Sequence, residues 1–189
     1  MKKMLLLLTV FSLSFCGTVY ISYDVGTGGE VEGSTFDDFD KGALMVGYNH
    51  GVHQSDDLSM AIGANYSLSP WTDELTGYKD LEVTSYNVYL LTKKDLSGDL
   101  SIWGTLGYGM ADDDNWFRDY IYGSTSGISS EVNGGLMYGL GFGYAVSETM
   151  SVGLGYSMNN YELEFSDGIN SATADIEVDR TFLYAAYSF

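Results

Sequence analysis

Apolar residues recur at every second position through most of this chain, and this period of two constrains the fold more than any other feature. Within residues 132–146, for example, Leu136, Tyr138 and Leu140 alternate with small residues. Such alternation is typical of β-strands with one apolar face. It occurs in eight segments, residues 19–25, 44–49, 59–68, 86–90, 101–109, 132–146, 151–157 and 181–189. Because 24 glycines also disfavour long helices, the sequence predicts an all-β protein.

The connections between these segments alternate between long and short. The long polar ones cover residues 26–40, 69–80, 111–130 and 165–174, and the short ones cover residues 53–57, 93–99 and 147–149. Since successive strands of a meander run in opposite directions, all long connections fall at one end of the sheet. A soluble sandwich or lipocalin-like barrel is the alternative, but it would usually place Lys and Glu on the non-core face, which here carries Gly, Ser, Asn and Thr. We therefore predict an eight-stranded antiparallel up-and-down transmembrane β-barrel with short periplasmic turns and four long external loops.

Residues 1–16 have the pattern of a secretory signal peptide. Two lysines precede a run of 12 mainly apolar residues, which is too short to cross a bilayer. Cleavage before Gly17 would leave residues 17–189 as the outer-membrane β-barrel domain. Lipidation of Cys16 is disfavoured because Phe15 stands where a lipoprotein signal has a small residue. Loss of the two lysines changes the formal net charge from −18 to −20, which excludes nucleic acid as a partner.

The last nine residues, TFLYAAYSF, place Leu183, Tyr187 and Phe189 on one face. A terminal aromatic strand after a signal peptide and an eight-strand meander resembles the small outer-membrane β-barrels of Gram-negative bacteria, the OmpA-like and OmpX-like group of the porin family. The resemblance implies a monomer in the bacterial outer membrane, in contact with lipid and lipopolysaccharide. It also implies that the barrel-assembly machinery reads these three residues. Pairing of the last strand with the first would remove the free sheet edge.

Polar side chains on the other face of the strands should point into the barrel. If Phe189 points to lipid, the inward set comprises Asp24, Asn65, Asn87, Asn133 and Arg180. Asp24 and Arg180 lie on neighbouring strands, so we expect them to pair and to help fill a lumen only just wide enough for side chains. Four large side chains of the same face could also occupy it: Tyr89, Trp103, Met137 and Tyr184. Glycines on the later strands leave room, so the sequence leaves open whether the lumen is sealed or conducts.

The third long connection is acidic and aromatic. Its aromatic residues are Trp116, Phe117, Tyr120 and Tyr122. They form either a recognition surface or an extension of the two strands above the bilayer, with rings packed across the hairpin. The carboxylates of residues 112–115 lack the pattern of a calcium loop. We expect them to attract loosely bound divalent cations beside lipopolysaccharide, and we expect no cofactor.

Catalysis is not expected. His53 and Ser55 have the spacing used by an outer-membrane lipid A deacylase, but they fall at a short periplasmic turn, away from the outer leaflet. The sequence therefore predicts a structural or surface-exposed outer-membrane barrel or a narrow porin-like conduit. One alternative is an adhesin or ligand-recognition protein acting through the acidic, aromatic loops. The other is a lipid-modifying outer-membrane enzyme.

Overall fold

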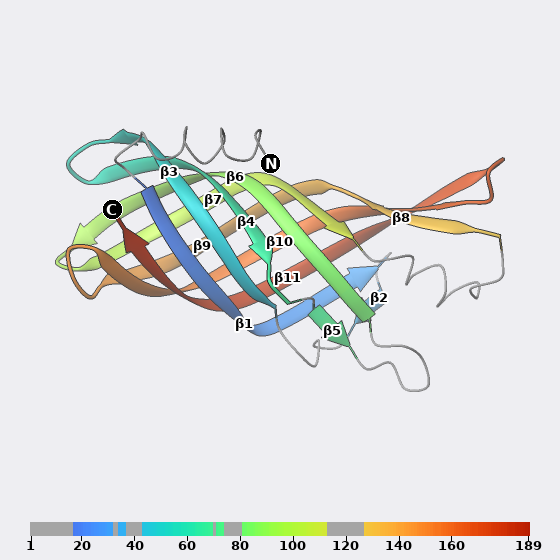
Figure 1. Ribbon diagram of the computed structural model, residues 1–189, viewed down its shortest axis with the longest axis horizontal. Helices are drawn as coiled ribbons and strands as arrows, with labels where there is room; N and C mark the ends of the chain where they lie inside the picture. The colour runs from blue at the N-terminus through green and yellow to red at the C-terminus, as the bar shows by residue number, and fades with distance from the viewer. Residues whose placement is uncertain (1–16, 32–33, 37–42, 70, 74–80, 113–126) are drawn as a thin grey trace, which may run out of the picture.

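The computed structural model describes residues 17–31, 34–36, 43–69, 71–73, 81–112 and 127–189, which form one barrel (Figure 1). Its strands are β1 (Gly17–Val31), β2 (Ser34–Phe36), β3 (Leu44–Gln54), β4 (Leu58–Ser67), β5 (Trp71–Asp73), β6 (Leu81–Ser97), β7 (Leu100–Asp112), β8 (Ser129–Asn133), β9 (Gly135–Ala145), β10 (Met150–Ser166) and β11 (Ser171–Ser188). No helix in these ranges is long and apolar enough to cross a membrane.

Eight of the strands form a closed ring. Neighbours pair antiparallel in the order β1, β3, β4, β6, β7, β9, β10 and β11, and β11 pairs again with β1. The other three strands extend this ring: β2 pairs with β1, β5 pairs with β6, and β8 continues the line of β9 along β10. The predicted eight-stranded up-and-down barrel is therefore confirmed.

The ring closes where the first and last described residues meet. The N–H of Gly17 donates to the carbonyl of Phe189 (3.2 Å), and the N–H of Phe189 donates to the carbonyl of Gly17 (3.0 Å). Both residues lie at the end of the barrel that carries the short turns. Since each strand of the ring is paired on both sides, the sheet has no free edge to expose in a medium without water.

The prediction of a fourth long loop at residues 165–174 is wrong. β10 and β11 remain paired up to Ser166 and Ser171, so only a short turn at residues 167–170 connects them. The Asp167 carboxylate closes this turn by accepting the backbone N–H groups of Asn170 (2.7 Å) and Ile169 (2.8 Å). These hydrogen bonds hold the pKa of Asp167 below its ordinary value. The hairpin therefore projects as ordered strands rather than as a loop.

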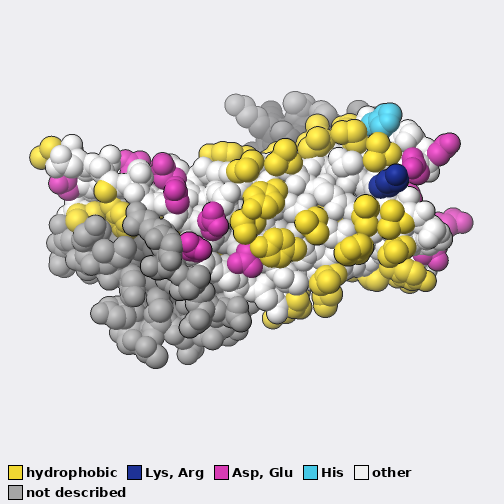
Figure 2. Space-filling model, turned by 180° about the vertical axis from the view of Figure 1, so that it is seen from behind, with side chains coloured by type: hydrophobic (Ala, Val, Ile, Leu, Met, Phe, Trp, Pro, Cys, Tyr) yellow, Lys and Arg dark blue, Asp and Glu magenta, His cyan; other side chains and the backbone are white. Residues whose placement is uncertain are grey.

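The outer face of the barrel carries a belt of apolar side chains, which we call the apolar belt (Figure 2). It covers the part of the wall nearer the short turns. Tyrosines lie toward both of its rims: Tyr23, Tyr66, Tyr86, Tyr108 and Tyr138 on the side of the long connections, and Tyr144 and Tyr187 on the side of the short turns. An apolar band flanked by aromatic girdles is the outer surface of a membrane-spanning barrel.

Beyond the apolar belt, toward the long connections, the pattern of the two faces reverses. We call this part the extension. Its outward positions on β10 and β11 are acidic, such as Glu162 and Glu177, whereas Ile176 and Val178 point inward. An apolar cluster fills its interior, which we call the plug: Ala43, Met45, Ala111, Tyr161, Leu163, Ile176 and Val178, with Val132, Phe165 and Ala174 packed against it. The extension is thus built like a soluble barrel, with its apolar face inward.

Candidate lumenal site

Asp24 of β1 and Arg180 of β11 meet inside the barrel, on the side of the plug that faces the short turns. Arg180 Nε donates to Asp24 Oδ2 (2.9 Å) and Nη2 donates to Oδ1 (2.5 Å), which makes a bidentate pair. Asp24 Oδ2 also accepts the backbone N–H of Ala43 (3.1 Å). The two side chains are only 2% and 3% exposed. A fork of parallel charge-assisted bonds therefore fixes the orientation of the guanidinium inside the barrel.

A ladder of amides crosses the lumen beside this ion pair. Asn159 Nδ2 donates to Asn87 Oδ1 (2.6 Å) and to Tyr161 Oη (2.7 Å). Asn87 Nδ2 in turn donates to Asn65 Oδ1 (2.7 Å). The ladder links β10, β6 and β4, and its Tyr161 end is part of the plug. These contacts tie opposite walls of the barrel together.

Two tyrosines carry the same network toward the short turns. Asn65 Nδ2 donates to Tyr20 Oη (2.9 Å), and Tyr20 Oη shares a hydrogen bond with Tyr89 Oη (2.7 Å). Tyr89 Oη donates to Asn49 Oδ1 (2.9 Å). Glycines at facing positions make room for the rings, since a Cβ at Gly47 would lie 2.3 Å from the ring of Tyr20. The network ends at the wall of an open cavity.

Four of the five polar residues expected in the lumen lie there, but the prediction for Asn133 is wrong. Asn133 pairs with the outward-facing Glu162, whereas Met137 of the same segment points inward. The pairing register shifts by one residue between β8 and β9, at Gly134. Such a bulge moves every side chain beyond it to the other face of the sheet.

Sequence reasoning missed Asn49 and Asn159, both of which belong to the lumenal network. The signal was present, because Asn49 follows Gly47 and Asn159 follows Ser157 at the two-residue period of the inward face. Asn49 is the last residue of the alternating segment 44–49, and Asn159 lies two residues beyond the segment 151–157, where β10 continues the same alternation.

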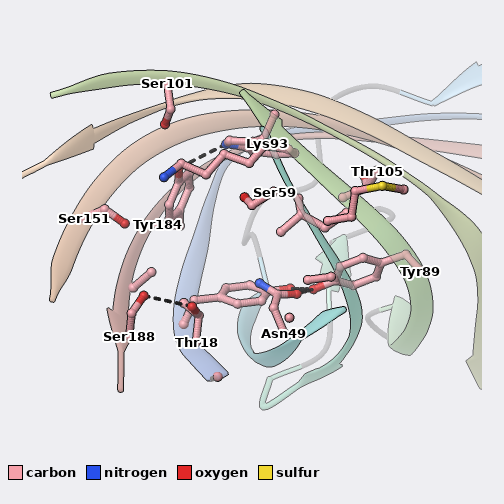
Figure 3. A pocket seen from close by; sticks show the side chains of 18 of the residues that line it. Thr18, Asn49, Ser59, Tyr89, Lys93, Ser101, Thr105, Ser151, Tyr184 and Ser188 are labelled. Atoms are coloured by element: carbon pink, nitrogen blue, oxygen red, sulfur yellow. Dashed lines mark hydrogen bonds between the residues drawn. The ribbon is translucent and has the colours of Figure 1, made fainter. Parts of the chain in front are cut away.

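A cavity of about 640 Å³ fills the lumen between this network and the short turns (Figure 3). Gly17, Ser55 and Phe189 line its open end, and Met45 and Arg180 line its closed end. The labelled side chains in Figure 3 are mainly hydroxyls and amides that reach in from several strands of the wall. The cavity is therefore a blind recess with mixed polar and apolar walls, and it opens beside Gly17 and Phe189.

One side of the cavity is aromatic. Trp103 Nε1 donates to Tyr184 Oη (3.0 Å), and the Trp103 ring packs 6.1 Å from the ring of Phe182. Glycines of β9 and β10 accept these rings: a Cβ at Gly141 would lie 2.4 Å from the Trp103 ring, and one at Gly155 would lie 2.5 Å from the Phe182 ring. The glycine-rich strands thus seat the aromatic groups rather than leaving the lumen empty.

The other predicted sites lie elsewhere. The four aromatic residues of the third long connection and residues 113–115 of its acidic stretch lie outside the described residues: Trp116, Phe117, Tyr120 and Tyr122, with Asp113, Asp114 and Asn115. Within the described ranges, no group of three or more His, Cys, Asp or Glu side chains is arranged to hold a metal. His53 and Ser55 are exposed at the cavity mouth, where Ser55 Oγ donates to the carbonyl of Leu58 (3.2 Å).

No protein-family model and no curated protein matches the chain. Among solved structures, the barrel is similar to Ail, the attachment invasion locus protein of Yersinia pestis, solved in complex with the heparin analogue sucrose octasulfate (15% identity, 94% of this chain and 100% of that chain, TM-score 0.54). It is similar to Neisserial surface protein A (12% identity, 92% and 96%, TM-score 0.54). It is also similar to the outer membrane protein AlkL in lipid bilayers (14% identity, 93% and 90%, TM-score 0.56). The chain therefore has the fold of the small eight-stranded outer-membrane β-barrels.

Proposed function

We propose that the protein is a monomeric, surface-exposed barrel of the bacterial outer membrane whose lumen is closed to solutes. In this proposal residues 1–16 direct export and are removed, and the apolar belt contacts lipid. Leu183, Tyr187 and Phe189 serve the barrel-assembly machinery, and their side chains are exposed on the outer face of the closing strand. The short turns face the periplasm and the extension stands outside the cell.

The plug is the observation that carries this proposal. Leu163 is 0% exposed and Met45 is 1% exposed. They are this buried even though the part of the barrel nearer the short turns contains a cavity. On the cavity side of these residues, Arg180 and Asp24 of the neighbouring strands β11 and β1 form a buried ion pair. A solute crossing the barrel would have to displace close-packed apolar side chains and then separate a buried ion pair, and both steps are costly.

The lengths of β10 and β11 support a role outside the membrane. They contain 17 and 18 residues, whereas about 9–11 residues suffice for a tilted strand to cross a bilayer. The surplus of about seven residues corresponds to roughly 20 Å of paired strand. The barrel therefore presents an ordered hairpin above the membrane surface rather than a flexible loop.

Planar-bilayer recordings test the closed lumen. We expect refolded protein, shown to be folded by faster migration on unheated than on boiled gels, to give no discrete conductance steps, because the plug leaves no water-filled path. A known porin inserted in the same bilayer is the positive control. Reproducible steps from the folded protein, scaling with salt concentration, would show an open lumen and contradict the proposal.

Recognition by the extension is the second candidate function, and its outward carboxylates favour it. Like charges lie directly opposite each other across its strands, as in Glu164 with Glu131 and Glu177 with Glu30. Such a surface repels polyanions, such as the sucrose octasulfate with which Ail was solved, and attracts cationic partners.

A binding assay on a cationic surface tests this candidate. We expect protein in nanodiscs to be retained on immobilised polylysine but not on heparin, and 0.5 M NaCl to release it, because salt screens exposed charges. The double variant Glu131→Lys with Glu164→Lys should be retained several-fold less. The control is Leu68→Met, an uncharged substitution on the apolar belt. If the wild type and the double variant were retained equally, the carboxylates of the extension would not be the binding surface, and this candidate function would be contradicted.

A further inference from the structure

We propose that the lumenal cavity binds a small neutral sugar, a mono- or disaccharide, which enters from the end of the barrel that carries the short turns. The cavity of about 640 Å³ lies within the range of about 300–1,000 Å³ that is usual for small-molecule sites. Because Arg180 and Met45 line its closed end, a molecule that enters must leave by the same route. The recess is thus shaped for binding rather than for passage.

The buried charge at the closed end of the cavity disfavours an ionic ligand. Arg180 is held there by Asp24, and both side chains are at most 4% exposed. An anion would have to break this pair to reach Arg180, and leaving a buried charge without its partner is costly. The Lys93–Asp95 pair near the mouth (3.0 Å) is exposed to solvent and sets no such barrier. A neutral molecule avoids the cost at the closed end.

Hydroxyl groups in the wall favour a ligand with many hydroxyls of its own. Ser59 of β4, Ser101 of β7 and Ser151 of β10 all line the cavity (Figure 3). A hydroxyl both donates and accepts, so it can pair with the hydroxyls of a sugar in either direction. An acyl chain in the same place would leave these groups unsatisfied, which is unfavourable.

The aromatic side supplies the surface that a sugar ring needs. Trp103 and Phe182 present rings that are already seated against glycines of β9 and β10, and Tyr184 fixes the indole through its N–H. The C–H face of a pyranose packs against such a ring while its hydroxyls turn to the opposite wall, where Asn49 and Tyr89 are hydrogen-bonded to each other. Apolar walls with a few placed polar groups are the general composition of small-ligand sites.

Fluorescence titration of the full barrel in nanodiscs tests the proposal. Substituting Trp71→Phe and Trp116→Phe leaves Trp103 as the sole tryptophan of the three in the chain. We expect maltose and glucose to change its emission saturably, with a Kd near the millimolar range. Glucuronate, which carries a charge, should bind at least tenfold more weakly than glucose.

Two matched variants locate the site. Ser59→Ala removes a hydroxyl that lines the cavity, with little change of shape, and should weaken binding roughly tenfold. Thr92→Val is the control, because Thr92 lies on the outer face of the adjacent strand β6 and should leave binding unchanged. Equal affinity in both variants would place any binding outside the cavity.

Three other outcomes would overturn the proposal. One is the absence of saturation by either neutral sugar up to about 0.1 M, a hundred times a weak Kd of about 1 mM. Another is tighter binding of glucuronate than of glucose. The third is a response to decanol or detergent monomers without a response to sugars, which would assign the cavity to an apolar chain. None of these outcomes depends on whether the barrel conducts.

Discussion

Replacing Arg180 with alanine should lower the free energy of unfolding by about 3–5 kcal/mol. The change leaves the Asp24 carboxylate, which is 2% exposed, without the two hydrogen bonds that the guanidinium donates. A buried charge that has lost its counterion is far more costly than the absence of both charges. Urea unfolding in lipid vesicles, followed by the loss of the fast-migrating gel band, measures the shift of the midpoint at unchanged slope.

The double variant Asp24→Asn with Arg180→Gln is the control for this prediction. It removes both charges and keeps an amide oxygen that can accept the backbone N–H of Ala43. We expect it to lose less than half of what Arg180→Ala loses, since no unpaired charge is left behind. If Arg180→Ala instead costs under about 1 kcal/mol, water from the cavity must solvate Asp24, and the ion pair would then contribute little to the closed end of the lumen.

The fold could be predicted from the sequence where the apolar belt dominates the pattern. Leu136, Tyr138 and Leu140 must alternate because lipid lies on one side of β9 and the lumen on the other. The same rule failed at residues 165–174, which were assigned to a loop because they are polar. Those strands stand in the extension, where the outer face is polar and the apolar residues point inward. Composition alone does not show where along a strand the surrounding solvent changes.

The lumenal site could be predicted only as far as the two-residue alternation of side chains continues without a break. This alternation places Asp24 and Arg180 on the same face of two neighbouring strands, and their contact then follows from closure of the ring. It fails for Asn133, because the register shift at Gly134 has no clear signal beyond a pair of glycines. The contacts of Asn87 with Asn159 cross the lumen. They depend on strand tilt and stagger, which are properties of the closed barrel rather than of any one segment.

Leu140→Arg should destabilise the barrel by about 2–4 kcal/mol in lipid. Leu140 is 58% exposed and lies on β9 between the outward-facing Tyr138 and Tyr144, which places it near the middle of the apolar belt. A guanidinium there must sit in hydrocarbon or draw water and headgroups toward it, and both are unfavourable. The measurement is reversible urea unfolding in vesicles of a fixed phospholipid, compared with the wild type under the same conditions.

Val146→Arg provides the matched control, because Val146 is equally exposed, at 59%, but lies at a short turn beyond Tyr144. The cost of a charge on the lipid face falls to about 0–1 kcal/mol near the interface, so the two variants should differ by at least about 2 kcal/mol if the apolar belt spans the hydrocarbon. A barrel whose outer face met water would tolerate both substitutions equally, since surface changes usually stay within about 0.5 kcal/mol. Equal costs would therefore disprove the membrane-spanning orientation of the belt, even with the ring of strands intact.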